Sequence, residues 1–126
     1  MKKEGRKLVD DLTLLLELYE DIYANVCNTY ELLQHDAPQY ALAISYLSLA
    51  HNSYMHAHVY IRTNGLHDND FEEVLTAYKR MKHDIDEVIV QQNNDCRSLV
   101  MRYKEFEQAY LYSKKSLDSI LQVKLP

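Results

Sequence analysis

Hydrophobic side chains recur at helical spacing over the first quarter of the chain. Between residues 3 and 34 they return every three or four positions, which places them along one stripe of an α-helix. Acidic residues such as Glu17 and Glu31 lie beside this stripe. The pattern therefore predicts one long amphipathic helix over residues 3–34. Its hydrophobic stripe consists of Leu8, Leu12, Leu15, Tyr19, Ile22, Val26, Tyr30 and Leu33.

The second helical stretch, residues 37–62, is hydrophobic on two sides. Asp36 is suited to accept from the free N–H groups at its start, and Pro38 is suited to its first turn. A helix with two hydrophobic stripes is typical of a central position with several neighbours, so we expect this helix to be covered on more than one side. The stripes are Tyr40, Ile44, Leu47, Ala50 or His51, Tyr54, His58 and Ile61, and Leu42, Tyr46, Leu49, Ser53, His56 and Tyr60.

A polar loop over residues 63–70 separates the second and third helical stretches. Gly65 is suited to the left-handed conformation that ends many helices. Asn69 or Asp70 is suited to cap the next helix. Helical spacing then predicts a third helix over residues 69–92, whose stripe is Phe71, Val74, Leu75, Tyr78, Met81, Ile85, Val88 and Ile89.

Five consecutive polar residues, 91–95, interrupt the pattern before it resumes. In one interpretation the chain turns at Asn93 or Asn94 and a fourth helix follows. In the other, one helix continues through the polar stretch, because Val88 and Leu99 are 11 residues, or three turns, apart. The turn is favoured because it gives four helices of similar length, as a bundle requires.

The sequence thus predicts a single all-α domain spanning residues 1–126. We expect an antiparallel up-down four-helix bundle, with three long helices and one extended C-terminal helix as the alternative. The presence of only 2 Gly and 2 Pro supports this class, since β-sheet folds need many turns. The expected helices cover residues 3–34, 37–62, 69–92 and 95–122.

Charge and composition argue against three classes of protein: nucleic-acid-binding, membrane-spanning and secreted proteins. The net charge is −5, and lysines and arginines are interspersed with acidic residues, which argues against nucleic-acid binding. No run of 18 hydrophobic residues predicts a membrane span, and the charged N-terminus does not look like a secretory signal. Cys27 and Cys96 are far apart and are expected to be reduced thiols. We therefore predict a cytoplasmic protein.

Three of the six histidines, His51, His56 and His58, lie in the second helical stretch. Residues 40–61, which are rich in alanine and tyrosine, resemble the second helix of ferritin-like proteins, especially small ones of bacterial and phage genomes. In that family a Glu-x-x-His pair on this helix helps to hold two metal ions inside a four-helix bundle. His56 matches the histidine of the pair, whereas Ser53 occupies the position of the glutamate.

This departure changes what the resemblance implies for a cofactor. Without a carboxylate at Ser53, a complete di-iron or di-manganese site is not expected, and the simplest interpretation is a bundle that has no cofactor. The alternative is a single Fe, Mn or Zn ion bound by His56 together with Glu20 and Glu87, which lie on the first and third helical stretches.

A second motif suggests a different chemistry. Arg62 and His67 are spaced as R-x4-H, which is similar to the signature of HEPN-type ribonucleases, another all-helical family. In those enzymes an arginine and a histidine act together on the scissile phosphate of RNA. A ribonuclease using Arg62 and His67 is therefore a second alternative, although the acidic net charge does not favour RNA binding.

The 11 tyrosines lie mostly on or beside the hydrophobic stripes. Tyrosine is common at protein interfaces, so the aromatic group on the last helical stretch is a candidate subunit interface. We therefore predict a non-enzymatic helical-bundle protein that acts through self-association, as a homodimer, or through a protein partner. The candidate interface residues are Tyr103, Phe106, Tyr110 and Tyr112.

Overall fold

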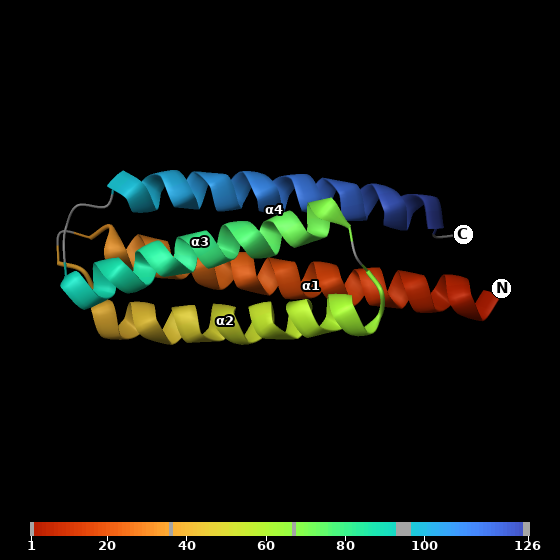
Figure 1. Ribbon diagram of the computed structural model, residues 1–126, viewed down its shortest axis with the longest axis horizontal. Coiled ribbons are helices and arrows are strands. Elements are labelled where there is room, and N and C mark those ends of the chain that lie inside the picture. Colours follow the sequence, from red (N-terminus) through yellow and green to blue (C-terminus); the bar gives the residue numbers. More distant parts are fainter. Residues whose placement is uncertain (1, 36, 67, 93–96, 125–126) are drawn as a thin grey trace.

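The computed structural model describes residues 2–35, 37–66, 68–92 and 97–124, with side chains from residue 6 to 123. These residues form four helices and no strand. In Figure 1 the helices lie alongside one another and each runs opposite to the one before it. The predicted antiparallel up-down four-helix bundle is confirmed. Its helices are α1 (Lys2–Leu33), α2 (Tyr40–Thr63), α3 (Asn69–Gln91) and α4 (Arg97–Lys124).

At the junction between the third and fourth helices, where the sequence allowed either a turn or one continuous helix, the chain reverses direction. Helix α3 ends at Gln91, and Gln92 has a left-handed backbone with φ of 48°. Helix α4 then returns antiparallel to α3 (Figure 1). The alternative with one extended C-terminal helix is therefore wrong, while the predicted turn residues Asn93 and Asn94 lie outside the described residues.

The junction between α2 and α3 follows the predicted glycine signal. Gly65 has φ of +64°, and the N–H of Leu66 donates to the carbonyl of Ile61 at 2.9 Å. This bond and the left-handed glycine form the usual closing turn of a helix. The next helix is capped by Asp68, whose carboxylate accepts from the N–H of Asp70 at 2.8 Å. The prediction of Asn69 or Asp70 as the cap is therefore wrong by one or two positions.

Helix α2 begins later than its sequence suggests. Its first residue is Tyr40, and Gln39 precedes it without a side-chain capping bond. The N–H of Gln39 donates instead to the carbonyl of Leu32 in α1, at 3.3 Å. This bond holds Pro38 in the connection between the helices, so the first-turn assignment of Pro38 is wrong. Asp36, the predicted cap, lies outside the described residues.

A row of alanines brings α1 and α2 close together. Ala43, Ala50 and Ala57 are seven residues apart, so they lie on one side of α2, and all three are fully buried. Helix α2 has its most extensive contact with α1 and a much smaller one with α3. The contact with α3 includes aromatic rings, since Tyr54 of α2 stacks on Tyr78 of α3 with 4.7 Å between ring centroids.

The second hydrophobic stripe of α2 is covered only in part. Ser53 is buried and Tyr60 is half-buried, but Leu42, Leu49 and His56 are exposed. Helix α2 packs against α1 and α3 but has no close contact with α4. The expected central position of α2 is therefore wrong, because α2 packs against only two helices and its remaining side faces solvent. No helix in the described ranges is long and hydrophobic enough to span a membrane.

The connection between α2 and α3 is short and joins neighbouring helix ends. It spans residues 64–68, and α3 starts at the same end of the bundle at which α2 stops (Figure 1). The connection therefore returns the chain directly into the neighbouring antiparallel helix.

Candidate functional site

The three predicted metal ligands lie apart in the bundle. His56 is exposed on α2, whereas the Glu20 carboxylate of α1 lies 3.9 Å from the Lys114 ammonium of α4. Glu87 is exposed on α3 and lies 3.4 Å from His83 one turn earlier. Among the residues whose placement is described, no three His, Cys, Asp or Glu side chains are grouped so as to hold a metal ion. The structure therefore does not bring His56, Glu20 and Glu87 together.

Ser53, at the position of the family's glutamate, has a structural contact. It is buried, and its hydroxyl donates to the carboxylate of Asp21 in α1. This bond links α1 to α2 across their close interface. The sequence pattern favoured Glu20 and not Asp21 as the functional acidic residue of this helix. Adjacent residues point about 100° apart, and only the packing decides which of the two faces α2.

The proposed ribonuclease pair is described only in part. Arg62 is exposed in the last turn of α2, where it lines a small groove of about 290 Å³ beside Lys79 of α3. His67 lies outside the described residues, so the relation between the two side chains is not defined. A basic residue at this position also interacts favourably with the C-terminal end of the helix dipole.

Two pairs of stacked tyrosines join α1 to α4. The rings of Tyr23 and Tyr110 are 4.2 Å apart and nearly parallel, and those of Tyr30 and Tyr103 are 4.1 Å apart. The hydroxyl of Tyr23 donates to a carboxylate oxygen of Glu107 at 2.7 Å. These contacts lie within one chain, so they stabilise the bundle itself.

The candidate interface on α4 is consequently divided. The side chain of Phe106 is completely buried, and Tyr110 is 5% exposed, so both belong to the core of the chain. Tyr103 is half-buried against α1. Only Tyr112, which is 62% exposed, presents most of its side chain to solvent. The predicted α4 interface is thus reduced to the surface around Tyr112.

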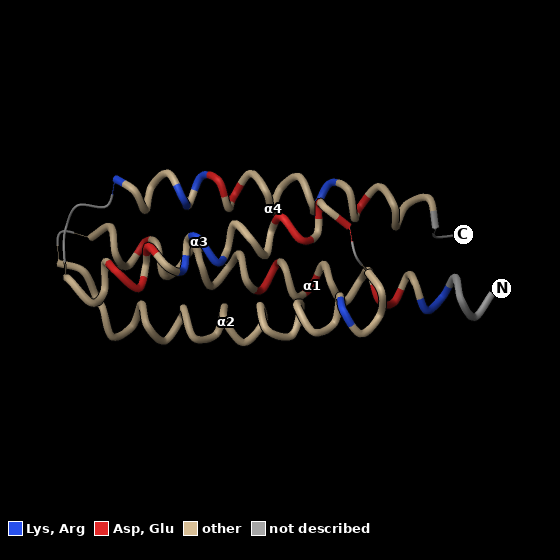
Figure 2. The backbone as a smooth tube through the Cα atoms, in the orientation of Figure 1, with Lys and Arg blue, Asp and Glu red and all other residues tan. Residues whose placement is uncertain are grey.

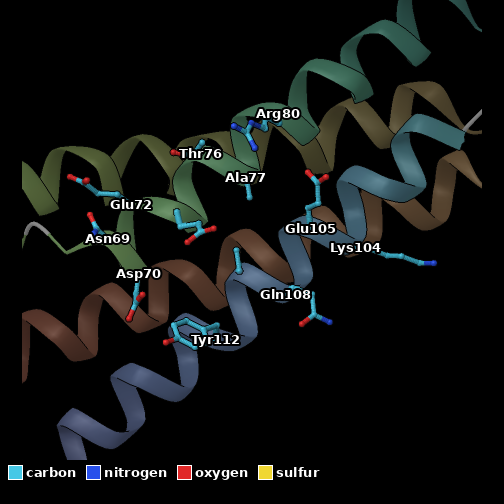
Figure 3. A pocket seen from close by; sticks show the side chains of 12 residues that line it. Asn69, Asp70, Glu72, Thr76, Ala77, Arg80, Lys104, Glu105, Gln108 and Tyr112 are labelled. Carbon is cyan, nitrogen blue, oxygen red and sulfur yellow. The ribbon is translucent and has the colours of Figure 1, made fainter.

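An open groove of about 1070 Å³ runs between α3 and α4 (Figure 3). Ala77 and Ala109 lie along it, and their small side chains leave the space between the helices unfilled. Its charged residues have both signs and do not converge on one point. Lys104, for example, projects away from Arg80 and Glu72 (Figure 3).

The most unusual surface belongs to α2. Five large hydrophobic residues of this helix are exposed, with Leu49 and Val59 at 52% and 55%. The helix contains no Asp, Glu or Lys, and its one charged residue is Arg62 (Figure 2). Leu42, Leu49 and Val59 lie within about 100° of one another around the helix, whereas Ile44 and Met55 lie on the opposite flank of its solvent side. We call the surface formed by Leu42, Leu49 and Val59 the α2 outer face.

A hydrophobic groove of about 510 Å³ extends the α2 outer face onto α1. Leu14 and Leu18 of α1 line it together with His56, Val59 and Tyr60 of α2. The surface available to a partner therefore spans both helices. His56 and Tyr60 belong to the second predicted stripe of α2, which was expected to be covered, whereas Val59 belongs to neither stripe.

A hydrogen bond between α1 and α2 fixes one of the side chains that line this groove. The hydroxyl of Tyr60 donates to the carboxylate of Asp11 in α1 at 2.7 Å, and Asp11 is itself buried. Burial, followed by the bond to Asp11 and the nearby charge of Asp10, raises the pKa of Tyr60 to about 12. The hydroxyl therefore remains a donor to Asp11 across the neutral range.

The raised pKa of Tyr60 predicts a loss of stability at alkaline pH. The folded state keeps the proton more strongly than the unfolded state, whose tyrosine pKa is about 10. The stabilisation is therefore complete below pH 10 and is lost as the pH rises towards 12. Urea unfolding measured at several pH values should give a falling free energy of unfolding over this interval. Burial also raises the pKa of Tyr19, Tyr54 and Tyr78.

The variant Tyr60→Phe provides the control for this titration. It removes one of the groups with a raised pKa, so its free energy of unfolding should fall less steeply between pH 10 and 12 than that of the wild type. Absorbance at 295 nm follows tyrosine ionisation directly. Ionisation of all tyrosines near pH 10 with unchanged circular dichroism would contradict the prediction.

Compared with known proteins, the sequence matches no family model, no curated protein and no solved structure. Of its candidate surfaces, the α2 outer face combines exposed hydrophobic residues with an almost complete absence of charge.

Proposed function

We propose that the protein is a non-enzymatic helical-bundle module that acts by binding another protein surface with its α2 outer face. The observation that carries this proposal is the exposure of Leu42, Leu49 and Val59 on a helix whose one charge is Arg62. Exposed hydrophobic patches of this kind are typical of protein interaction sites.

The energetics of hydrophobic burial support this role. Covering apolar surface contributes about 25 cal/mol per Å², so a partner that buries Leu42, Leu49 and Val59 gains a substantial driving force. Part of that gain offsets the entropy lost on association. The other three helices would gain less free energy from such burial, since they carry many acidic and basic residues (Figure 2).

The non-enzymatic character is supported by the arrangement of the polar groups. The large groove between α3 and α4 has no converging set of side chains. The hydroxyls of Ser53 and Tyr60 are engaged in bonds between α1 and α2. These polar groups hold the bundle together and keep the α2 outer face in shape.

Site-specific photo-crosslinking tests this proposal. A photoreactive benzoylphenylalanine replaces Leu49 in protein produced in its source cells, and Leu111 of α4 serves as the matched control because it is 48% exposed against 52% for Leu49. If a protein covers the α2 outer face, irradiation should give a covalent adduct from position 49 and little from position 111. Equal labelling at both positions, or no adduct at position 49, would contradict the proposed function.

A further inference from the structure

We propose that the small groove between α2 and α3 binds an organic anion, a molecule with a hydrophobic body and one carboxylate or phosphate group. This site goes beyond the proposed function, because the groove and the α2 outer face lie on different sides of α2. Leu49 of that face and Tyr54 of the groove are five residues apart, so they point about 140° apart around the helix.

The position of the groove follows from the spacing of residues on two antiparallel helices. Tyr54, His58 and Arg62 are four residues apart, so they lie on one side of α2, and they line the groove together with Leu75 and Lys79 of α3. Direct contact between these two helices is small, which leaves room between them. The groove measures about 290 Å³, near the lower end of the range of small-molecule sites, so its ligand is small.

The floor of the groove is hydrophobic. Ile61 and Leu75 are 2% and 6% exposed, and Tyr54 beside them is 6% exposed. Tyr54 is held in place by its stacking on the ring of Tyr78. A hydrophobic group placed against these side chains is removed from water, which favours binding. The floor therefore suits the hydrophobic body of a small molecule.

The rim of the groove has an excess of positive charge. Arg62 and Lys79 are exposed, and both carry hydrogen-bond donors but no acceptors. Within the described ranges neither side chain forms an ion pair, whereas Lys82, close to Lys79 on α3, is paired with Asp86 at 2.7 Å. Glu72 also lines the groove, so its described residues carry two positive charges and one negative charge. This excess favours an anion over a cation or a neutral molecule.

Tyr54 and His58 supply further donors. The hydroxyl of Tyr54 forms no hydrogen bond with any described residue, although buried hydroxyls normally have a partner. Burial raises the pKa of Tyr54, so the hydroxyl keeps its proton and can donate it to an oxygen of the anion. The ring of His58 stacks on that of Tyr54 and adds a ring N–H to the lining. Charge-assisted bonds from such donors are the strongest that a carboxylate or phosphate forms.

Amide chemical shifts measured by nuclear magnetic resonance test the site. Benzoate and phenyl phosphate are the probes, since each joins a hydrophobic ring to one anionic group. Both should shift the signals of residues 54–62 and 72–79 in a saturable manner, with a Kd of about 1 mM or lower, and the tighter probe identifies the anionic group. Benzyl alcohol and inorganic phosphate should bind at least about ten-fold more weakly, because one lacks the charge and the other lacks the ring.

Adjacent residues of α3 provide a matched pair of variants. Lys79→Gln and Arg80→Gln each remove one exposed positive charge, but Arg80 lines the other groove, between α3 and α4 (Figure 3). Lys79→Gln and Arg62→Gln should each weaken the binding of both probes at least about five-fold, whereas Arg80→Gln should change it by less than about two-fold. Tyr54→Phe keeps the ring of the floor and should also weaken binding, because it removes a donor. Circular dichroism confirms that each variant is folded.

Several results would overturn the site. Equal losses in Lys79→Gln and Arg80→Gln would show a response to net charge alone. Equal binding of benzyl alcohol or inorganic phosphate would contradict an amphipathic anion as the ligand, and no shift at residues 54–62 and 72–79 with about 10 mM of either probe would exclude binding in the groove. None of these results changes the crosslinking expected from position 49, so the proposed function is tested separately.

Discussion

Replacing Phe106 by alanine is expected to lower the free energy of unfolding by about 3–5 kcal/mol, the usual cost of removing a buried aromatic ring. Phe106 is completely buried, and its ring lies 6.1 Å from that of Tyr23 in α1 and 6.3 Å from that of Tyr78 in α3. The ring thus joins three helices. Urea unfolding followed by circular dichroism at a fixed protein concentration measures the loss.

The matched control is Tyr112→Ala, which removes an aromatic ring that is 62% exposed on the same helix. Its free energy of unfolding should stay within about 0.5 kcal/mol of the wild type. The two variants therefore distinguish the core from the surface of α4. If Phe106→Ala dissociated subunits without changing the stability of the monomer, Phe106 would be an interface residue after all and its buried position would be incorrect.

Enlarging Ala50 to leucine is expected to lower the free energy of unfolding by about 3 kcal/mol. Ala50 is fully buried in the middle of the alanine row, so a larger side chain must push the packed helices apart or adopt a strained rotamer. The effect cannot come from helix propensity, because leucine is almost as favourable in a helix as alanine. Thermal unfolding should show a fall in Tm of about 10 °C.

Ala41→Leu is the control for this variant. It makes the same chemical change on the same helix, but Ala41 is exposed, so the free energy of unfolding should change by less than about 0.5 kcal/mol. Equal stability of the two leucine variants would show that the alanine row does not set the distance between α1 and α2.

The two core variants also bear on the α2 outer face. Ala50 and Leu49 are neighbours in the sequence but point in directions about 100° apart, one towards α1 and the other to solvent. A change at Ala50 should therefore affect folding, while a change at Leu49 should affect association. The two sides of α2 should therefore have different roles, the buried side in folding and the exposed hydrophobic side in association.

Much of the fold was predictable because its signals are local. A repeat of three or four residues identifies a helix without reference to any other part of the chain, and the four predicted helices agree with the structure apart from the start of α2. Gly65 marks the end of α2 because its left-handed conformation is a property of the residue itself. The turn after α3 was less certain, since its polar residues also suit an exposed helix surface.

The candidate site was less predictable because it depends on which sides of the helices meet. Tyr110 and Tyr112 are both aromatic residues of α4, yet a two-residue step turns a helix by about 200° and separates core from solvent. In the same way, Glu20 and Asp21 are adjacent, but Asp21 is the one that bonds to Ser53. Residue type alone could not assign these positions.

The sequence by itself determined that this chain forms four amphipathic helices and that α2 is hydrophobic on two sides. Only the tertiary structure decided which of these sides is covered. The alanine row of α2 fits closely against α1, where small side chains let the backbones approach, and this contact leaves Leu42, Leu49 and Val59 facing solvent. Periodicity records that a residue is hydrophobic, whereas its burial depends on which neighbouring helix packs against it.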